Sequence, residues 1–226
     1  MRRYVSTRAR LGLALVAASL VSVGFFAVGA FTNRSLELWY LNWNLFLAWV
    51  PIGLMLLLER TLRKRLWSSW QALVLTGLFL AFLPNTFYLM TDVIHLQESA
   101  RVDLIFDVAM FQSFILNGCV LGFLSVYLLH IELRKRLNDL SSWLLVGTAL
   151  FITSFAIYIG RELRWNTWDI LLNPASILFQ VSESILHPTE HHETFSITLS
   201  FFVLLTSLYV AIWYTARMAR KQKLLD

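Results

Sequence analysis

Cysteine is almost absent from the chain: Cys119 is the only one among 226 residues. It lies between Gly118 and Val120 in an apolar run, so an intramolecular disulfide and a cysteine-based zinc cluster are both excluded. We interpret Cys119 as a packing residue.

The chain also lacks the motifs of several enzyme classes. It has no glycine-rich phosphate loop, and its basic polar segments are too short to hold a nucleotide-binding domain, which disfavours an ATP-driven mechanism within the chain. It has no serine nucleophile elbow, which disfavours a serine hydrolase. No internal repeat is evident.

Acidic residues are fewer than basic ones: the chain has 14 Asp and Glu and 19 Lys and Arg, for a formal net charge of +5. An excess of basic residues can indicate nucleic-acid binding, but here they stand at the ends of apolar blocks and form no single stripe. The charge therefore indicates membrane topology, and we expect no nucleic-acid partner.

Apolar residues dominate the chain, at 58% of the total with a mean hydropathy of +0.63, more than a soluble domain typically contains. They form blocks of about 20 residues, the length that crosses a bilayer core of about 30 Å as a helix. The first block follows MRRYVSTRAR and is longer than the core of an ordinary signal peptide, so we expect a retained anchor. The sequence predicts an all-α polytopic membrane helix bundle that forms a single integral membrane domain over residues 1–226. The six predicted transmembrane helices are about 11–31, 39–58, 70–91, 104–130, 143–159 and 195–214.

The orientation of the bundle follows from its basic residues, which are in excess in cytoplasmic loops. Fifteen of the 19 Lys and Arg fall on one side of the predicted spans. They are Arg2, Arg3, Arg8, Arg10, Arg60, Arg63, Lys64, Arg65, Arg134, Lys135, Arg136, Arg217, Arg220, Lys221 and Lys223. The prediction is a multi-pass protein of the cell (inner or plasma) membrane with both termini in the cytoplasm, and most acidic residues fall at the extracytoplasmic face.

The longest loop, about residues 160–194, is on the extracytoplasmic side in this topology. Asn173 and Pro174 are a typical helix start, with a capping residue followed by proline at the first helical position. The apolar residues that follow recur at helical spacing, but the segment is too polar to cross the membrane. We expect an amphipathic helix along the outer interface or over the bundle.

The outer end of the third span carries an unusual set of polar residues: Asn85, Tyr88, Asp92 and His95. If an α-helix continues through this segment, the last three share one face. Pro84 removes a backbone hydrogen bond and is expected to kink the helix, and Asn85 can satisfy a carbonyl that the kink releases.

The fourth span begins with Asp103 and Asp107, one helical turn apart. An ionisable group inside the membrane boundary is costly unless it is paired or hydrated, which makes Asp107 a candidate functional residue. The alternative is that Asp107 lies in the headgroup region. Deeper polar residues that could continue a path through the bundle are Asn42, Asn44, Gln112 and Asn117.

The segment GRELRWNTWD after the fifth span supplies Arg161, Arg164, Trp165, Asn166 and Asp169. A guanidinium group binds carboxylates or phosphates in a bidentate fork, so the two arginines are natural partners for the outer aspartates or for lipid phosphates. The tryptophan has an alternative interpretation as part of the interfacial aromatic belt.

Histidines gather before the sixth span, in HPTEHHE. His187, His191 and His192, together with His95, are candidate metal ligands. Their spacing matches no catalytic zinc motif, and a solvated histidine-rich loop is the alternative. The sequence identifies no cofactor.

The run PNTFYLMTDVIHL, the segment GRELRWNTWD and the six-span layout together resemble an uncharacterised prokaryotic membrane-protein family, domain of unknown function 1361. The resemblance covers most of the chain, from about the second span to the sixth, and HPTEHHE is not part of it. The matching residues are Pro84, Asn85, Tyr88, Thr91, Asp92, His95, Leu96, Gly160, Arg161, Arg164, Trp165, Asn166, Trp168 and Asp169. The resemblance implies no activity.

Three hypotheses for function stay open. The first is transport of a small polar solute or ion, with Asp92, His95 and Asp107 as proton or cation groups. The second is a membrane enzyme acting on a lipid or lipid-linked substrate at the outer leaflet, with Asp92 or Asp107 as base, His95 as acid/base or metal ligand, and Arg161 and Arg164 binding a phosphate. The third is a non-catalytic assembly or scaffold subunit whose charged pairs hold helices together. The expected partners are the lipid bilayer and either a lipid headgroup or a small polar solute. The sequence indicates no oligomeric state.

Overall fold

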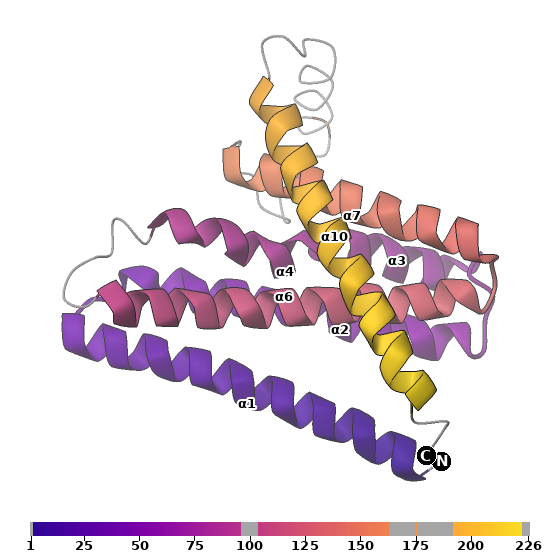
Figure 1. Ribbon diagram of the computed structural model, residues 1–226, viewed down its shortest axis with the longest axis horizontal. Helices are drawn as coiled ribbons and strands as arrows, with labels where there is room; N and C mark the ends of the chain where they lie inside the picture. Colours follow the sequence, from indigo (N-terminus) through magenta and orange to yellow (C-terminus); the bar gives the residue numbers. More distant parts are fainter. Residues whose placement is uncertain (1, 96–103, 163–174, 176–191, 223–226) are drawn as a thin grey trace.

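The computed structural model describes residues 2–95, 104–162, 175 and 192–222, and the regular elements within these ranges are all helical (Figure 1). In chain order they are α1 (Arg2–Asn33), η1 (Glu37–Trp39), α2 (Tyr40–Leu62), α3 (Trp70–Phe82), α4 (Pro84–Tyr88), η2 (Leu89–His95), α6 (Leu104–Arg134), α7 (Asp139–Glu162) and α10 (His192–Gln222). The two η elements are 3₁₀-helices.

Within the described residues, six helical stretches are long and apolar enough to cross a membrane, which confirms the predicted all-α class and six helices of spanning length. They are Thr7–Asn33, Glu37–Leu62, Trp70–Ile94, Leu104–Arg134, Asp139–Arg161 and Phe195–Ala219. Each begins or ends within about two turns of its predicted limit. The predicted interfacial helix after Asn173 and Pro174 lies outside the described residues, and the orientation in the membrane stays a prediction.

The middle of the bundle is formed by α2, α3, α4, α6 and α7, with α1 and α10 at its periphery. In Figure 1, α1 runs along one side of the bundle and α10 crosses obliquely over α7. α1 packs mainly on α6, and α10 mainly on α7. Both outer helices expose apolar side chains, including Leu13, Phe31, Leu199 and Val203, as expected of surfaces that face lipid tails.

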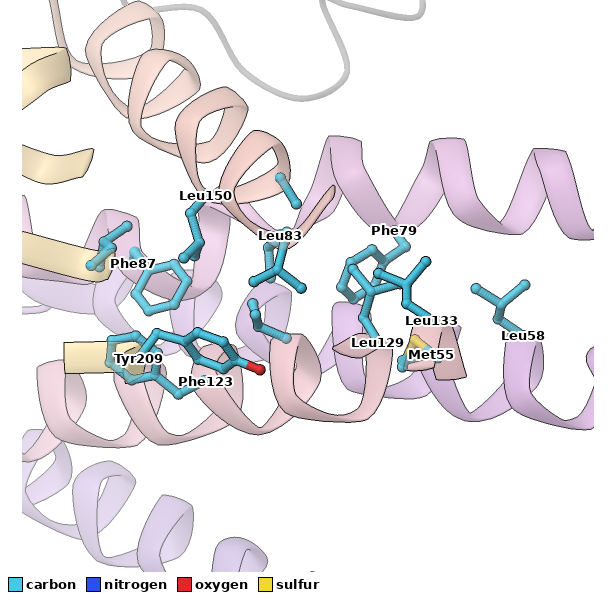
Figure 2. Packing of buried hydrophobic residues seen from close by; sticks show 14 of the residues in the cluster. Met55, Leu58, Phe79, Leu83, Phe87, Phe123, Leu129, Leu133, Leu150 and Tyr209 are labelled. Atoms are coloured by element: carbon cyan, nitrogen blue, oxygen red, sulfur yellow. The ribbon is translucent and has the colours of Figure 1, made fainter. Parts of the chain in front are cut away.

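Two clusters of buried apolar side chains form the core. The first joins α2, α3, α4, α6, α7 and α10; Figure 2 labels ten of its residues, among them Phe79, Phe87 and Leu150. The second fills the space between α1, α2, η2 and α6. Its members include Leu15, Leu41, Leu45, Leu89, Met110, Phe111 and Phe114.

The third span is broken at Pro84, as predicted. α3 ends at Phe82, and the backbone amide of Thr86 donates to Leu83 O at 3.1 Å, one residue short of its α-helical acceptor. That leaves Phe82 O to accept from Asn85 Nδ2, at 3.1 Å. The predicted role of Asn85 at the kink is therefore confirmed. Beyond Leu89 the chain is 3₁₀-helical, so the α-helical continuation considered for the outer polar residues does not hold.

The short helix α4 lies unusually close to α6 because Gly118 and Gly122 have no side chains. A Cβ atom at Gly118 would lie 2.4 Å from Thr86 O, and one at Gly122 would lie 2.4 Å from Thr86 Oγ1 and 2.6 Å from Phe87 Cζ. Glycines four residues apart let two membrane helices approach at backbone distance. This contact fixes the position of the broken span against α6.

Candidate functional site

Asp92 lies at the centre of a polar cluster built from three helices. Its side chain, on η2, is only 2% exposed. Asn44 Nδ2 of α2 donates to Asp92 Oδ2 at 3.2 Å, and Arg161 Nη1 of α7 lies 3.9 Å from Asp92 Oδ1. The predicted pairing of an arginine after the fifth span with an outer aspartate is thus observed for these two residues.

Tyr88 makes a second link from the broken span to α7. Its hydroxyl donates to Gly160 O at 3.3 Å. Because Gly160 precedes Arg161, Tyr88 and Asp92 both contact the last turn of α7. Thr91 Oγ1 donates to Tyr88 O at 2.7 Å and ties the start of η2 to α4. Side-chain contacts therefore hold the PNTFYLMTD segment near both of its ends, through Asn85 at the start and Asp92 at the end.

Asp107 lies in the first turn of α6 and is 4% exposed. The N-terminus of a helix carries a partial positive charge that stabilises a carboxylate. This environment lowers the energetic cost of burying Asp107. Its depth in the membrane stays a prediction.

The other predicted site residues are only partly described. His95 ends η2 and His192 begins α10. The structure describes the backbone of both residues but not their side chains. Asp103, Arg164, Trp165, Asn166, Asp169, His187 and His191 lie outside the described residues. Within the part of the chain that is described, no group of three or more His, Cys, Asp or Glu side chains could hold a metal ion. Metal binding by the histidines stays a prediction.

The broken span also carries a buried apolar side chain next to the polar cluster. Leu89, which follows Tyr88, is fully buried with Leu45 and Phe111 in the second core cluster. Of the deeper polar residues, Asn117 joins α6 to α1: its Nδ2 lies 2.7 Å from Ser22 Oγ and 3.1 Å from Ala18 O. We find that Asn117 serves an interhelical contact.

Residues 43–208, about three quarters of the chain, match the sequence profile of the family described as "Protein of unknown function (DUF1361)". The chain belongs to this family. No curated protein and no solved structure is similar enough to match it. The matched region includes Asn44, Asp92 and Arg161, so the polar cluster lies within the family domain, whereas α1 lies before it.

The opposite end of this DUF1361 protein holds a buried aromatic cluster that the sequence analysis missed. His130 of α6 is fully buried, and its Nδ1 lies 2.9 Å from the hydroxyl of Tyr209 on α10. Trp213 stacks on the imidazole at a centroid distance of 3.9 Å, and Trp143 of α7 meets it edge-on. His130 and Tyr209 are far apart in the sequence and belong to no motif, so no local signal could have paired them.

A buried carboxylate at the same end was also missed. Glu59 of α2 accepts from Arg8 Nη1 of α1 at 3.0 Å and from Arg63 Nη2 at 2.9 Å. Arg136, which follows α6, donates to Leu62 O at 3.2 Å. Basic residues from three of the predicted clusters therefore lie at one end of the bundle.

Proposed function

We propose that this protein transports a small polar solute or an ion, and that Asp92 is the group that binds a proton or cation at the extracytoplasmic end of the bundle. The observation that supports the proposal is a buried carboxylate on a break in a membrane-spanning helix. Discontinuous helices commonly form the substrate and ion sites of transporters. Ionisable residues within spanning segments are costly, and they commonly mark ion and substrate pathways.

The arrangement around Asp92 gives binding a structural consequence. Arg161 Nη1 and Asp92 Oδ1 are 3.9 Å apart, a separation longer than a hydrogen bond. A proton or cation on Asp92 neutralises the carboxylate and weakens its attraction to Arg161. Since Arg161 belongs to α7 and Asp92 to the broken span, ligand binding would loosen the contact between two spans. The apolar layer around Leu89 and Phe111 would close the site toward the middle of the bundle in this state.

The second candidate is a non-catalytic assembly subunit. It is favoured by the fact that Asn44 and Arg161, from two other spans, both contact Asp92, as a structural link between helices would. Under this alternative Asp92 holds the fold and binds no ligand. The third hypothesis, an enzyme acting at the outer leaflet, also requires His95 as acid/base or metal ligand and Arg164 beside Arg161, and the side chains of His95 and Arg164 lie outside the described part of the chain.

Ion flux through reconstituted protein tests the proposal. Vesicles that contain the full chain and an entrapped pH-sensitive or sodium-sensitive dye are given an inside-negative potassium diffusion potential. We expect proton or sodium uptake faster than in protein-free vesicles, and we expect Asp92→Asn to abolish the excess. Glu37→Gln is the matched control, because it removes the same charge from an exposed position at the same end of the bundle. It should leave the flux unchanged.

The thermal unfolding of each variant in detergent separates the two candidates. Absence of excess flux in the wild type, for both ions, would reject transport. If in addition Asp92→Asn unfolds at a clearly lower temperature than Glu37→Gln, the assembly hypothesis is supported. If Asp92→Asn does not fold at all, Asp92→Glu keeps the carboxylate, and transport requires that its flux persist.

A further inference from the structure

A basic pocket lies where α2 ends and α3 begins. It has a volume of about 450 Å³ and is lined by Arg60, Thr61, Arg63, Lys64, Arg65 and Gln71. Four of these six residues are cationic and none is acidic, so the pocket has the charge of an anion site. It lies at the opposite end of α2 from Asn44 and does not depend on the proposed function.

The carboxylate of Glu59, which contacts Arg63 of the lining, does not neutralise this pocket. Glu59 is shared between Arg63, at 2.9 Å, and Arg8 of α1, at 3.0 Å. Arg65 Nη1 lies 3.4 Å from the neutral Gln71 side chain. One negative charge is thus divided between two arginines, and the lining retains an excess of positive charge.

The start of α3 adds to the positive potential. The hydroxyl of Ser69, at the N-cap position, donates to Leu66 O at 2.7 Å and makes no capping hydrogen bond to α3. No acidic residue lies in the first turn of this 13-residue helix. The positive end of the helix dipole is therefore not offset by a carboxylate beside Gln71.

The surroundings of the pocket are apolar and exposed. Leu66 is 78% exposed and lies between the second and third spans, and Trp70, the first residue of the third span, is 69% exposed. Leu73 and Val74 continue the exposed apolar surface along α3. Tryptophan at the end of a span is typical of the headgroup level of a bilayer. A ligand that fits both features carries a phosphate and hydrocarbon chains.

We propose that this pocket binds the phosphate of an anionic phospholipid, with its acyl chains along the exposed face of α3. Basic pockets between transmembrane helices on the cytoplasmic side bind anionic headgroups. The combination of four cationic lining residues with exposed Leu66, Trp70 and Leu73 favours a lipid over a free phosphate, because a free phosphate makes no use of the apolar surface.

The test is lipid binding to the full chain, purified in detergent, measured by native mass spectrometry as phosphatidylglycerol is added. The pocket variant combines Arg60→Gln, Lys64→Gln and Arg65→Gln, and it spares Arg63 because of its bond to Glu59. Removing three basic residues near an anionic headgroup should weaken binding at least about tenfold. The matched control combines Arg217→Gln, Arg220→Gln and Lys221→Gln, which removes the same charge around the C-terminal end of the sixth span and should change binding less than about twofold.

Two further probes distinguish the sources of phosphate. Phosphatidylcholine should bind the wild type much more weakly than phosphatidylglycerol, and inorganic phosphate should not displace the bound lipid. Equal loss in the pocket and control variants, equal binding of the two lipids, or displacement by inorganic phosphate would each overturn the proposal. If the triple variant does not keep the wild-type thermal unfolding profile, Lys64→Gln alone should still weaken binding roughly fivefold.

Discussion

Replacing Gly118 by alanine tests the close packing of the broken span against α6. The new Cβ would lie 2.4 Å from the carbonyl oxygen of Thr86 and 2.7 Å from Leu89 Cδ1. The carbonyl belongs to the backbone of α4, so it cannot move aside without moving the helix. Inserting a group into a filled core typically costs about 1–3 kcal/mol. Alanine recovers up to about 1 kcal/mol through its higher helix propensity.

Gly147→Ala is the matched control, because it makes the same change within α7 where no atom lies within 4 Å of the new Cβ. The control should gain the helix-propensity term alone. The difference in unfolding free energy between the two variants then isolates the steric effect, and we expect Gly118→Ala to be less stable than Gly147→Ala by about 1–3 kcal/mol.

Both free energies can be measured by reversible unfolding in mixed micelles of a mild detergent and sodium dodecyl sulfate, followed by tryptophan fluorescence. The variants are compared at one protein concentration and one lipid content. Equal stability of Gly118→Ala and Gly147→Ala would refute the backbone contact between α4 and α6. A stability loss in both variants would refute the helix-propensity argument.

Two further predictions concern the polar contacts that hold the outer helices. Tyr209→Phe removes the hydroxyl that bonds His130 and should lower the unfolding free energy by about 0.5–1.5 kcal/mol in the same assay. The exposed Tyr214→Phe should change it little, and similar effects of both would contradict the role of this hydrogen bond. A double-mutant cycle of Asn117→Ala and Ser22→Ala should give a coupling energy near 0.6 kcal/mol, the average for hydrogen bonds between membrane helices. Strict additivity would show that this contact does not hold α1 to α6.

The spans, the helix break and part of the polar site could be predicted from the sequence. Hydropathy summed over a segment decides whether that segment crosses a bilayer, since the backbone must satisfy its own hydrogen bonds there. The break at Pro84 is equally local, because proline lacks the amide that the helix requires. Asn85, one residue later, could be assigned to a released carbonyl for the same reason.

The partners of Asp92 needed more than local pattern. The sequence placed an arginine after the fifth span within the same polar face, but Asp92, Asp103 and Asp107 were all suitable acceptors for it. Asn44 was considered only as part of a path through the bundle. The GxxxG spacing of Gly118 and Gly122 was present in the sequence and could have indicated the α4 contact, but not which helix would fill it.

The sequence by itself determined the six helices that, within the described residues of this DUF1361 protein, are long and apolar enough to span a membrane, and it determined where the third one breaks. The tertiary structure alone decided that Arg161 and Asn44 meet at Asp92, that Tyr209 reaches His130, and that Arg8 shares Glu59 with Arg63. The physical reason is that hydropathy fixes the length of a span but not its rotation about its axis. Which side chains face each other is set by packing between helices, through close approaches such as that of α4 to Gly118.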